Sequence, residues 1–387
     1  MKKICFLTTS RADFGVLEDL IEEVIDSKFF YVQLIVSGSH IEKIYGNTQK
    51  EIFVKKKCFI RKIKVISKNK DTKSVALSFA DCVNKFTNEL TKLKPNIFVV
   101  FGDRYEMLAG TIAAYILRIP IVHIAGGEKT NGSLDEGFRH SISKLSNLHF
   151  PVTNTYKKRL IQLGENPKRI FNFGSLNLTK IKKNKYLTKK ELEEKLKIKF
   201  YNNNLMVTYH PDTIRVKKNL KNLSILLKSL KEIKNTMVII TSPNADAEGV
   251  LMIDYINKFI KKNKLKNFIF FKSLGSQVYL SLLKIVDGVV GNSSSGISEA
   301  PFFGIGTVNI GDRQEGRTMF SSVINCKISK NSIVKSVKKI LKKNIKKKSS
   351  NSLRVFGNGK TSKKITKKLL SFDFKKNHKK IFYDYLK

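Results

Sequence analysis

The sequence predicts an α/β protein built from two parallel-sheet domains, and three observations lead to this prediction. The chain has 387 residues, more than one hydrophobic core usually serves. Short runs of β-branched and aromatic residues alternate with longer helical patterns, which is typical of parallel sheets with helices on both faces. Clusters of polar residues follow the predicted strands, where ligands bind in such sheets.

In the first half of the chain, six runs of apolar residues predict strands. These are Ile4–Thr8, Val32–Val36, Ile97–Phe101, Ile121–Ile124, Leu148–Pro151 and Ile170–Phe173. Helical patterns fit between them, and we expect helices over Val16–Asp26, Ser74–Leu93, Glu106–Leu117 and Glu136–Leu145.

The second half of the chain repeats this alternation. Its predicted strands are Leu205–Tyr209, Met237–Thr241, Phe268–Phe271, Gly288–Gly291 and Thr307–Ile310. A segment rich in Lys and Asn, residues 176–204, separates the two halves. We therefore expect a first domain over residues 1–175, a second domain over 176–365 and a basic helical tail over 366–387.

The composition is that of a globular protein of the cytoplasm. Hydrophobic residues make up 41% of the chain, and no run of eighteen apolar residues predicts a membrane-spanning helix. The apolar stretch Ile4–Leu7 is too short for a signal peptide. Four cysteines lack metal-binding or redox spacing and are expected to be reduced thiols: Cys5, Cys58, Cys82 and Cys326.

The formal net charge of +43 suggests, taken alone, a nucleic-acid or membrane-surface binder. The lysines are, however, spread widely, and no basic segment alternates with aromatic residues. We expect neither nucleic acid nor membrane as a partner, although a phosphate-bearing substrate would be attracted. The sequence contains no GxGxxG loop and no Walker loop, which argues against a nicotinamide enzyme and a P-loop NTPase.

Seven polar clusters follow predicted strands, in both halves of the chain. They are Thr8–Gly15, Gly102–Glu106, His123–Thr130 (continuing to Asp135, Glu136, Arg139 and His140), Tyr209–Asp212, Ser242–Asp246, Gly291–Glu299 and Gly311–Arg317. Because the carboxyl ends of parallel strands meet at one edge of a sheet, we expect these clusters to line one cleft.

The cluster Gly291–Glu299 predicts an anion site. Its small residues follow an apolar strand and open a helix, where backbone N–H groups and Ser hydroxyls suit a diphosphate. An ordinary serine N-cap explains the pattern equally well by itself, but Arg313 and Arg317 favour phosphate. Glu299 is placed to accept hydrogen bonds from ribose hydroxyls.

Three carboxylates are candidates for acid–base chemistry. Asp103 ends a buried strand between Gly102 and Arg104, where a plain helix cap is the alternative. Glu128 and Asp135 flank a glycine-rich loop and are expected to face the same cleft. Grouped carboxylates suit proton transfer at carbon when burial raises the pKa of one of them.

The histidines divide into two kinds. His123 and His149 lie within predicted strands and are expected to be structural. His210 stands at a strand end, before Pro211, and is the better functional candidate.

These clusters, in this order, resemble the UDP-N-acetylglucosamine 2-epimerase family, and most closely its hydrolysing branch, which supplies sialic and legionaminic acid synthesis. The similarity runs from about Lys3 to Ile365. Any one motif is weak, but the series is specific. It consists of Ser10–Gly15 (SRADFG), Gly102–Glu106 (GDRYE), Gly126–Thr130 (GGEKT), Arg139–Lys144 (RHSISK), Gly291–Gly296 (GNSSSG) and Ile310–Arg317 (IGDRQEGR).

The resemblance implies a GT-B architecture: two Rossmann-like domains with the site between them, and a last helix that crosses back onto the first domain, beginning near Gly357–Ile365. It implies conversion of UDP-N-acetylglucosamine and water to UDP and N-acetylmannosamine, without a metal or redox cofactor. We also expect a homo-oligomer, a dimer or a tetramer.

Residue roles follow from the same motifs. The resemblance implies that Asp103 and Asp135 act as acid and base, assisted by His210. Some relatives carry a glutamate where this chain has Ala125, so either Glu128 does that work or the proton goes elsewhere. The nucleotide and its diphosphate would be held by Arg11, Arg104, His210, Asn244, Ser293, Ser294, Glu299 and Arg313.

Three other functions remain open. Relatives in the same branch act on N,N'-diacetylbacillosamine activated by UDP or GDP, with the same chemistry. A GT-B glycosyltransferase would share the diphosphate site but would not need several acids in the first domain. A basic nucleic-acid-binding or membrane-surface protein would gather its lysines on one face and lose binding in salt.

Overall fold

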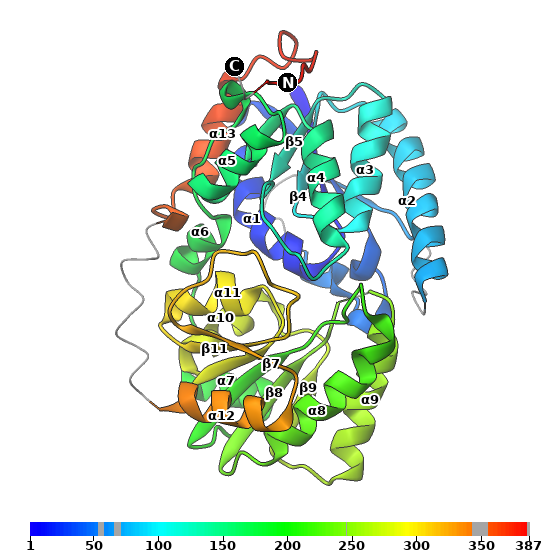
Figure 1. The fold of residues 1–387 in the computed structure, drawn as a ribbon. Helices are drawn as coiled ribbons and strands as arrows, with labels where there is room; N and C mark the ends of the chain where they lie inside the picture. Colours follow the sequence, from blue (N-terminus) through cyan, green and yellow to red (C-terminus); the bar gives the residue numbers. More distant parts are fainter. Residues whose placement is uncertain (53–57, 66–70, 245, 343–354, 385–387) are drawn as a thin grey trace.

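The computed structural model describes residues 1–52, 58–65, 71–244, 246–342 and 355–384, and they form two domains stacked end to end (Figure 1). Each domain holds a six-stranded sheet in which all strand pairs are parallel. The first sheet has the order β3-β2-β1-β4-β5-β6 and the second β12-β11-β10-β7-β8-β9. Both are doubly wound orders of the Rossmann type, so the predicted GT-B fold class is confirmed.

The strands are short and their residues are mostly buried. Those of the first sheet are β1 (Lys2–Thr8), β2 (Phe30–Val36), β3 (Phe59–Lys62), β4 (Ile97–Phe101), β5 (Ile121–Ile124) and β6 (Leu148–Phe150). Those of the second sheet are β7 (Asn203–Thr208), β8 (Thr236–Thr241), β9 (Phe268–Phe271), β10 (Gly288–Gly291), β11 (Gly306–Ile310) and β12 (Val323–Cys326).

Helices cover both faces of the first sheet, because a parallel sheet must bury both of its apolar faces. One layer consists of α1 (Arg11–Asp26), α6 (Leu176–Lys183) and α13 (Thr361–Ser371). The other layer contains α2 (Thr72–Leu93), α3 (Tyr105–Ile116) and α4 (Asp135–Leu145). Helix α5 (Asn154–Gln162) follows β6.

The second sheet is covered in the same way. On one face lie α8 (Asn219–Lys231), α9 (Gly249–Lys262) and α12 (Lys330–Leu341). On the other lie α7 (Lys189–Leu196) and α10 (Gly275–Ile285), beside the single turn α11 (Ser295–Ser298).

The chain crosses between the domains twice, and the two crossings lie side by side. The amide of Ser175 donates to the carbonyl of Phe356, and the hydroxyl of Thr361 donates to the carbonyl of Phe173. Gly174 has a φ of +93°, and a Cβ there would lie 2.3 Å from the carbonyl oxygen of Phe356. The crossing therefore requires glycine at this position.

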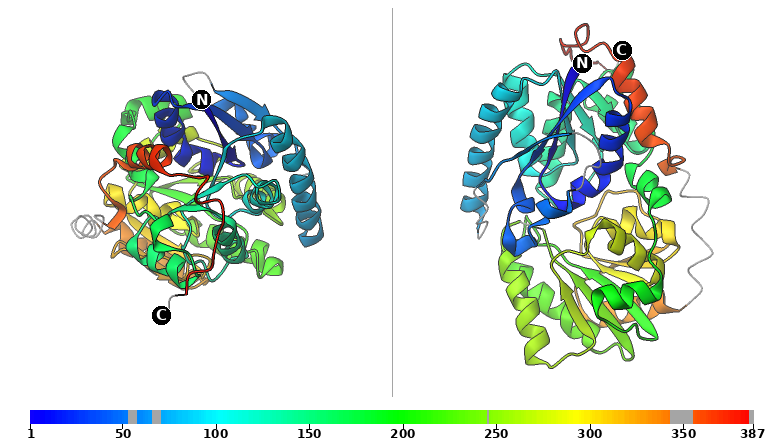
Figure 2. Two further views of the ribbon diagram at one scale, coloured as in Figure 1. Left: turned by 90° about the horizontal axis from the view of Figure 1, so that it is seen from above. Right: turned by 180° about the vertical axis from the view of Figure 1, so that it is seen from behind.

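Helix α6 begins at the first crossing and joins the two cores. Its Leu176 belongs to the core of the first domain and its Ile181 to that of the second. The proposed division near residue 175 falls at the start of this helix. After the second crossing, α13 returns onto α1, as expected, and the N-terminus and the last described residues both lie at the first-domain end of the molecule (Figure 2).

Three local predictions differ from the structure. Strands β3 and β12 were not predicted, and both lie at sheet edges. The segment Ile170–Phe173 is not a strand: only Ile170 forms a bridge, with His149. The expected helical tail over 366–387 is helical only as far as Ser371, and residues 372–384 form turns and irregular chain. Residues 385–387 lie outside the described residues, as does Ala245 of the cluster Ser242–Asp246.

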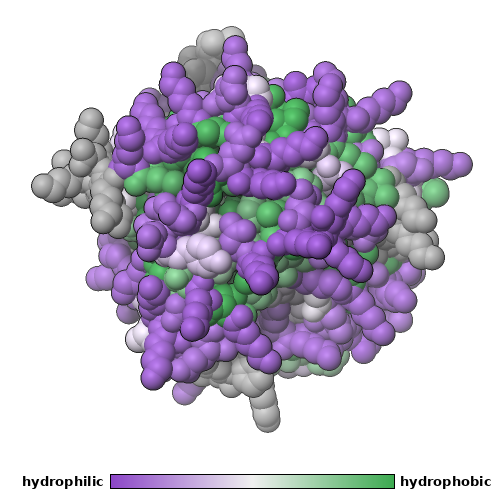
Figure 3. Space-filling model, turned by 90° about the horizontal axis from the view of Figure 1, so that it is seen from below, coloured by the Kyte–Doolittle hydropathy of each residue, from purple (hydrophilic) through white to green (hydrophobic). Residues whose placement is uncertain are grey.

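The surface in Figure 3 is largely hydrophilic, with apolar residues scattered between polar ones. Within the described ranges, none of the helices combines the length and the apolar composition that crossing a lipid bilayer requires.

Candidate active site

A cavity of about 720 Å³ lies between the two domains. All seven polar clusters predicted from the sequence contribute side chains to its walls. The predicted site residues all line it: Arg11, Asp103, Arg104, Glu128, Asp135, His210, Asn244, Ser293, Ser294, Glu299 and Arg313. The structure thus brings the whole predicted set together, although the role of each residue stays a prediction.

Sheet topology explains why these side chains meet. In the first sheet the strand order reverses between β1 and β4, and Arg11 and Asp103 follow these two strands. In the second sheet it reverses between β7 and β10, followed by His210 and the serines from Ser293. A crevice opens at each reversal because the connecting helices leave on opposite faces, and the two crevices face each other.

Asp103 is held by a buried arginine. The guanidinium of Arg139, whose side chain is 1% exposed, pairs with the Asp103 carboxylate and also with Glu136 at 3.1 Å. Arg139 further donates to the hydroxyl of Thr130 at 3.0 Å. The N-cap of α3 is Arg104, so the alternative interpretation of Asp103 as a helix cap does not describe its place in the structure.

The other two acids each face a cation from the second domain. Glu128 lies 3.2 Å from the guanidinium of Arg317, and Asp135 lies 3.7 Å from that of Arg313. Burial raises the pKa of Asp135, and the charge of Asp246 raises it further, whereas Arg313 lowers it. A buried carboxyl group with a raised pKa suits general acid chemistry.

His123 holds the backbone next to Asp103. Its Nε2 lies 2.8 Å from the carbonyl oxygen of Gly102 and its Nδ1 lies 3.0 Å from the hydroxyl of Ser143. A carbonyl can only accept, so Nε2 carries the proton. Burial lowers the pKa of His123 to about 3, and the ring is therefore neutral.

His210 is a neutral hydrogen-bond donor in the cavity wall. Its Nδ1 accepts from the backbone amide of Asn244 at 3.0 Å, which leaves the proton on Nε2. Burial lowers the pKa of His210 well below its usual value, and the charges of Arg313, Arg11 and Arg104 lower it further. This environment favours holding an anion over accepting a proton.

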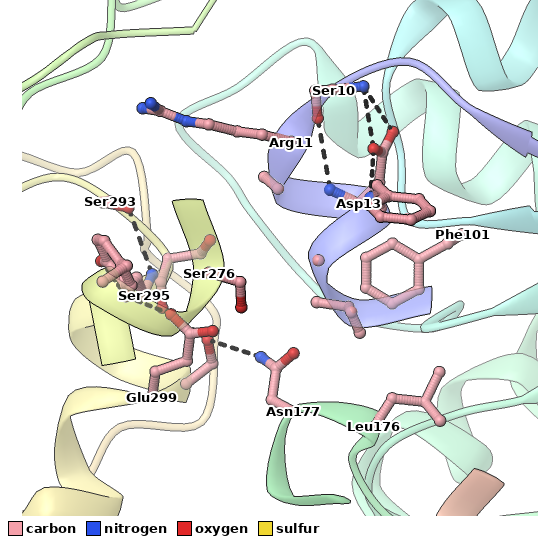
Figure 4. Close-up of a pocket in the computed structure, with 18 of the residues that line it drawn as sticks. Ser10, Arg11, Asp13, Phe101, Leu176, Asn177, Ser276, Ser293, Ser295 and Glu299 are labelled. Atoms are coloured by element: carbon pink, nitrogen blue, oxygen red, sulfur yellow. Dashed lines mark hydrogen bonds between the residues drawn. The ribbon is translucent and has the colours of Figure 1, made fainter. Parts of the chain in front are cut away.

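The serine cluster forms the opposite wall, on the second domain (Figure 4). Ser294 is the N-cap of α11, which has only one turn, so its dipole is small and an anion would rely on N–H groups and hydroxyls. Ser295 donates to the Glu299 carboxylate at 2.5 Å. Burial raises the pKa of Glu299.

Two predicted nucleotide-binding arginines connect the domains. Figure 4 shows Arg11 extending from α1 across the cavity, where it donates to the carbonyls of Lys272 and Ser242. Arg104 pairs with Glu106 of its own domain at 3.1 Å and lies 3.5 Å from Asp246 of the other. Both cations therefore already stand at the domain boundary.

The sequence did not single out Arg139 as a site residue. A signal was present, since Asp135 and Arg139 are one helical turn apart and so share a face of α4. Its partner Asp103, however, lies 36 residues away in the chain. In the described part of the chain, no group of three or more His, Cys, Asp or Glu side chains could hold a metal ion.

A sequence model of the family described as UDP-N-acetylglucosamine 2-epimerase matches residues 22–370. A Campylobacter jejuni protein named GDP/UDP-N,N'-diacetylbacillosamine 2-epimerase (hydrolyzing) is 43% identical over 328 residues, which cover 85% of each chain. The polysialic acid biosynthesis protein P7 of Escherichia coli is 37% identical, covering 87% of this chain and 85% of that one.

The fold has close counterparts among solved structures. The crystal structure of UDP-GlcNAc 2-epimerase from Neisseria meningitidis bound to UDP-GlcNAc matches with a TM-score of 0.77 and 18% identity, covering 96% of this chain and 100% of that one. At this level of identity the likeness concerns the fold alone.

Proposed function

Because the chain belongs to the UDP-N-acetylglucosamine 2-epimerase family, in its hydrolysing branch, we propose that it hydrolyses a nucleotide-activated 2-acetamido sugar with inversion at C2. The observation that carries this proposal is the arrangement of the cavity. Acids of the first domain (Asp103, Glu128 and Asp135) face serines and cations of the second. One side suits proton transfer and the other a departing diphosphate.

The proposed chemistry has two steps. In the first, a carboxylate takes the C2 proton while the C1–O bond breaks and the nucleoside diphosphate leaves with the bonding electrons. In the second, water adds across the C1–C2 double bond, and C2 receives its new proton from the opposite face. The C2 hydrogen is a poor acid, so the two bonds must break together, and stabilising the leaving group accelerates both.

We assign the leaving group to the second domain and to Arg11. Backbone N–H groups and hydroxyls at Ser293 and Ser294, the Nε2–H of His210 and the guanidinium of Arg313 can donate to diphosphate oxygens. The Glu299 carboxylate would accept from ribose hydroxyls.

We assign proton transfer to Asp103, Asp135 and Glu128. Ala125 has no group that could replace the glutamate of some relatives, whereas Glu128, three residues later, lines the cavity. Glu128 is therefore the proposed substitute. The guanidinium of Arg317, 3.2 Å away, would hold the Glu128 carboxylate in place at the cavity wall.

For the sugar, we propose N,N'-diacetylbacillosamine ahead of N-acetylglucosamine. The relative named for that substrate is 43% identical to this chain. The cavity wall also contains the apolar side chains of Phe101, Val152 and Phe356, which pack in one cluster and suit a deoxy sugar that carries a methyl group and a second acetamido group. The likeness to protein P7 supports a place in the synthesis of sialic-type acids.

The test is incubation of the pure protein in D₂O with UDP-N-acetylglucosamine and with UDP- and GDP-N,N'-diacetylbacillosamine, without an acceptor. We expect release of the nucleoside diphosphate and of a free sugar of manno configuration with one deuterium at C2. The bacillosamine substrate should have a kcat/KM at least about tenfold higher. No release from any of the three would contradict the proposal, and release that appears only when an acceptor is added in a second incubation would identify a glycosyltransferase.

A further inference from the structure

The chain does not end at the helix that returns to the first domain. The family match stops at residue 370, and the described residues 372–384, here called the C-terminal strap, run on over the first domain. The side chain of Asn147 donates to the carbonyls of Asn377 and His378, and Arg169 donates to that of Lys379 at 2.7 Å. Side chains of the first domain therefore hold the backbone of the strap by hydrogen bonds at three successive residues.

One lysine of the strap enters the protein. The ammonium group of Lys380, whose side chain is 16% exposed, donates to three backbone carbonyls, those of Ser143, Lys144 and Ser146. It also pairs with the fully buried carboxylate of Glu165 at 2.7 Å. The three carbonyls belong to the last turn and the C-cap of α4 (Asp135–Leu145).

A cation at this position stabilises the end of the helix. The last carbonyls of an α-helix have no partner within the helix and carry its negative dipole end. Lys380 supplies both hydrogen bonds and a positive charge there. It acts as a C-cap delivered from a segment more than 230 residues away in the chain.

One face of helix α4 bears the residues that connect it to the proposed catalytic carboxylates. Asp135, Arg139 and Ser143 follow one another at four-residue intervals, so they project from the same side. Arg139 pairs with Asp103, and Ser143 bonds to His123, which in turn holds the carbonyl of Gly102, next to Asp103. The position of α4 along its axis therefore sets the place of Asp103 by two separate routes.

We propose that Lys380 is a positioning residue for the reaction: by capping α4 from the C-terminal strap it holds Asp103 and Asp135 in register for proton transfer. The inference rests on the proposed function of the cavity. Lys380 itself does not line the cavity. It acts through Ser143 and Arg139.

The role predicts a loss confined to the chemical step. The groups assigned to the diphosphate are mostly on the second domain, whereas the partners of Lys380 all belong to the first. Nucleotide affinity should therefore not change. A shift of about 1 Å in a catalytic carboxylate can cost as much as a hundredfold in rate. We therefore expect a fall in kcat without a matching change in the dissociation constant of UDP.

The experiment compares K380M with K379M, a neighbouring exposed lysine of the same strap, and with K380R. K380M keeps the aliphatic stem but has no cation, and its kcat should fall by about tenfold or more, with UDP affinity by calorimetry within about twofold of wild type. K379M should match wild type. K380R should recover much of the rate, because arginine can also donate to several carbonyls.

A second variant keeps the test decisive if K380M does not fold. S143A leaves the strap intact and removes only the hydroxyl that bonds His123. It should lower kcat and spare UDP affinity in the same way. Amide hydrogen exchange over 135–145 should be faster in K380M than in K379M.

The outcomes separate this inference from the function on which it rests. A wild-type protein that releases no nucleoside diphosphate would contradict the proposed function. If the wild type turns over and K380M retains its kcat, Lys380 has no positioning role; if K380M does not fold, an S143A protein with wild-type kcat overturns the proposed route from α4 to Asp103. Equal losses of kcat in K379M and K380M would likewise overturn it, because the effect would then belong to the strap as a whole.

Discussion

At the residue scale, Asp103 is the side chain on which the proposed mechanism depends most. Asp103→Asn should abolish turnover and leave UDP affinity nearly unchanged. Asparagine keeps the shape of the side chain but cannot take a proton as a carboxylate does, and such a loss appears in kcat. The measurement is the rate together with solvent deuterium at C2 of the product.

Parallel substitutions test the other two acids of the cavity. Asp135→Asn should act similarly if the two aspartates divide the acid and base roles. Glu128→Gln should do so if Glu128 replaces the glutamate absent at Ala125. An Asp103→Asn protein that still turns over near the wild-type rate with deuterium at C2 would show that Asp103 only anchors Arg139.

The diphosphate assignment is tested at Ser294 and Arg313. Ser294→Ala and Arg313→Ala should each weaken UDP binding by about 1.5–3 kcal/mol, the loss expected for a charge-assisted hydrogen bond. Isothermal titration calorimetry measures this directly. Arg61→Ala is the control, since Arg61 is exposed, pairs with Glu89 and does not line the cavity. Unchanged affinity in both cavity variants would remove the assignment.

The sequence predicted which residues meet in the cavity better than it predicted how they are held. Motif residues such as Asp103 and His210 could be found because they follow strands of a recognisable pattern. Arg139 and His123 stand in the predicted clusters too, but what they do could not be predicted, because it lies in contacts with Asp103 and Gly102 across the fold. No pattern along the chain records such pairings.

At the element scale, the buried pair behind α4 predicts a loss of stability in acid. Burial by itself raises the pKa of Glu165, but the hydrogen bond with His149 and the charge of Lys380 outweigh this and lower it to about 2. The pKa of Lys380 is lowered to about 8, because its burial outweighs the attraction of Glu165. A group with this pKa does not titrate in acid, and we therefore assign the acid dependence to Glu165.

A carboxyl group whose pKa is depressed by folding stabilises the protein above its unfolded pKa, near 4.5. This contribution, on the order of 3 kcal/mol, should disappear as the pH falls from about 4.5 to 2. Glu165→Gln should lower the free energy of unfolding at pH 7 and reduce its dependence on pH in this window. Denaturant titrations at several pH values test this, and a variant with the wild-type pH dependence would contradict it.

The elements that the sequence failed to predict have a common physical cause. Strand β3 (Phe59–Lys62) is exposed along its whole length, and β12 is only partly buried, so neither shows the continuous apolar run of a central strand. In the reverse case, Phe171 and Phe173 are apolar because they pack against Phe150, not because they pair in a sheet. A short run of apolar residues is therefore found both in buried segments that do not pair and in strands, and the sequence alone does not distinguish them.

At the scale of the whole molecule, the net charge of +43 should act on the rate of substrate capture. A field of this sign draws a nucleotide sugar toward the cavity, and salt screens it over about 10 Å at 0.1 M. We expect the association rate constant of UDP to fall several-fold between about 0.05 and 0.5 M salt, with a smaller change in dissociation. Stopped-flow measurements would show it, and an association rate that does not vary with salt would contradict it.

The return of the chain to the first domain also sets the order in which the protein can be completed during synthesis. The core of the first domain includes Ile365, Leu369, Phe372 and Phe374, whereas the last helix that the structure describes in the second domain ends at Leu341. On the ribosome the second domain can therefore close first. At about 5–20 residues per second, the roughly 185 residues between the first crossing and α13 take about 10–40 seconds to synthesise, and during that time the side of α1 that α13 will cover is accessible to chaperones.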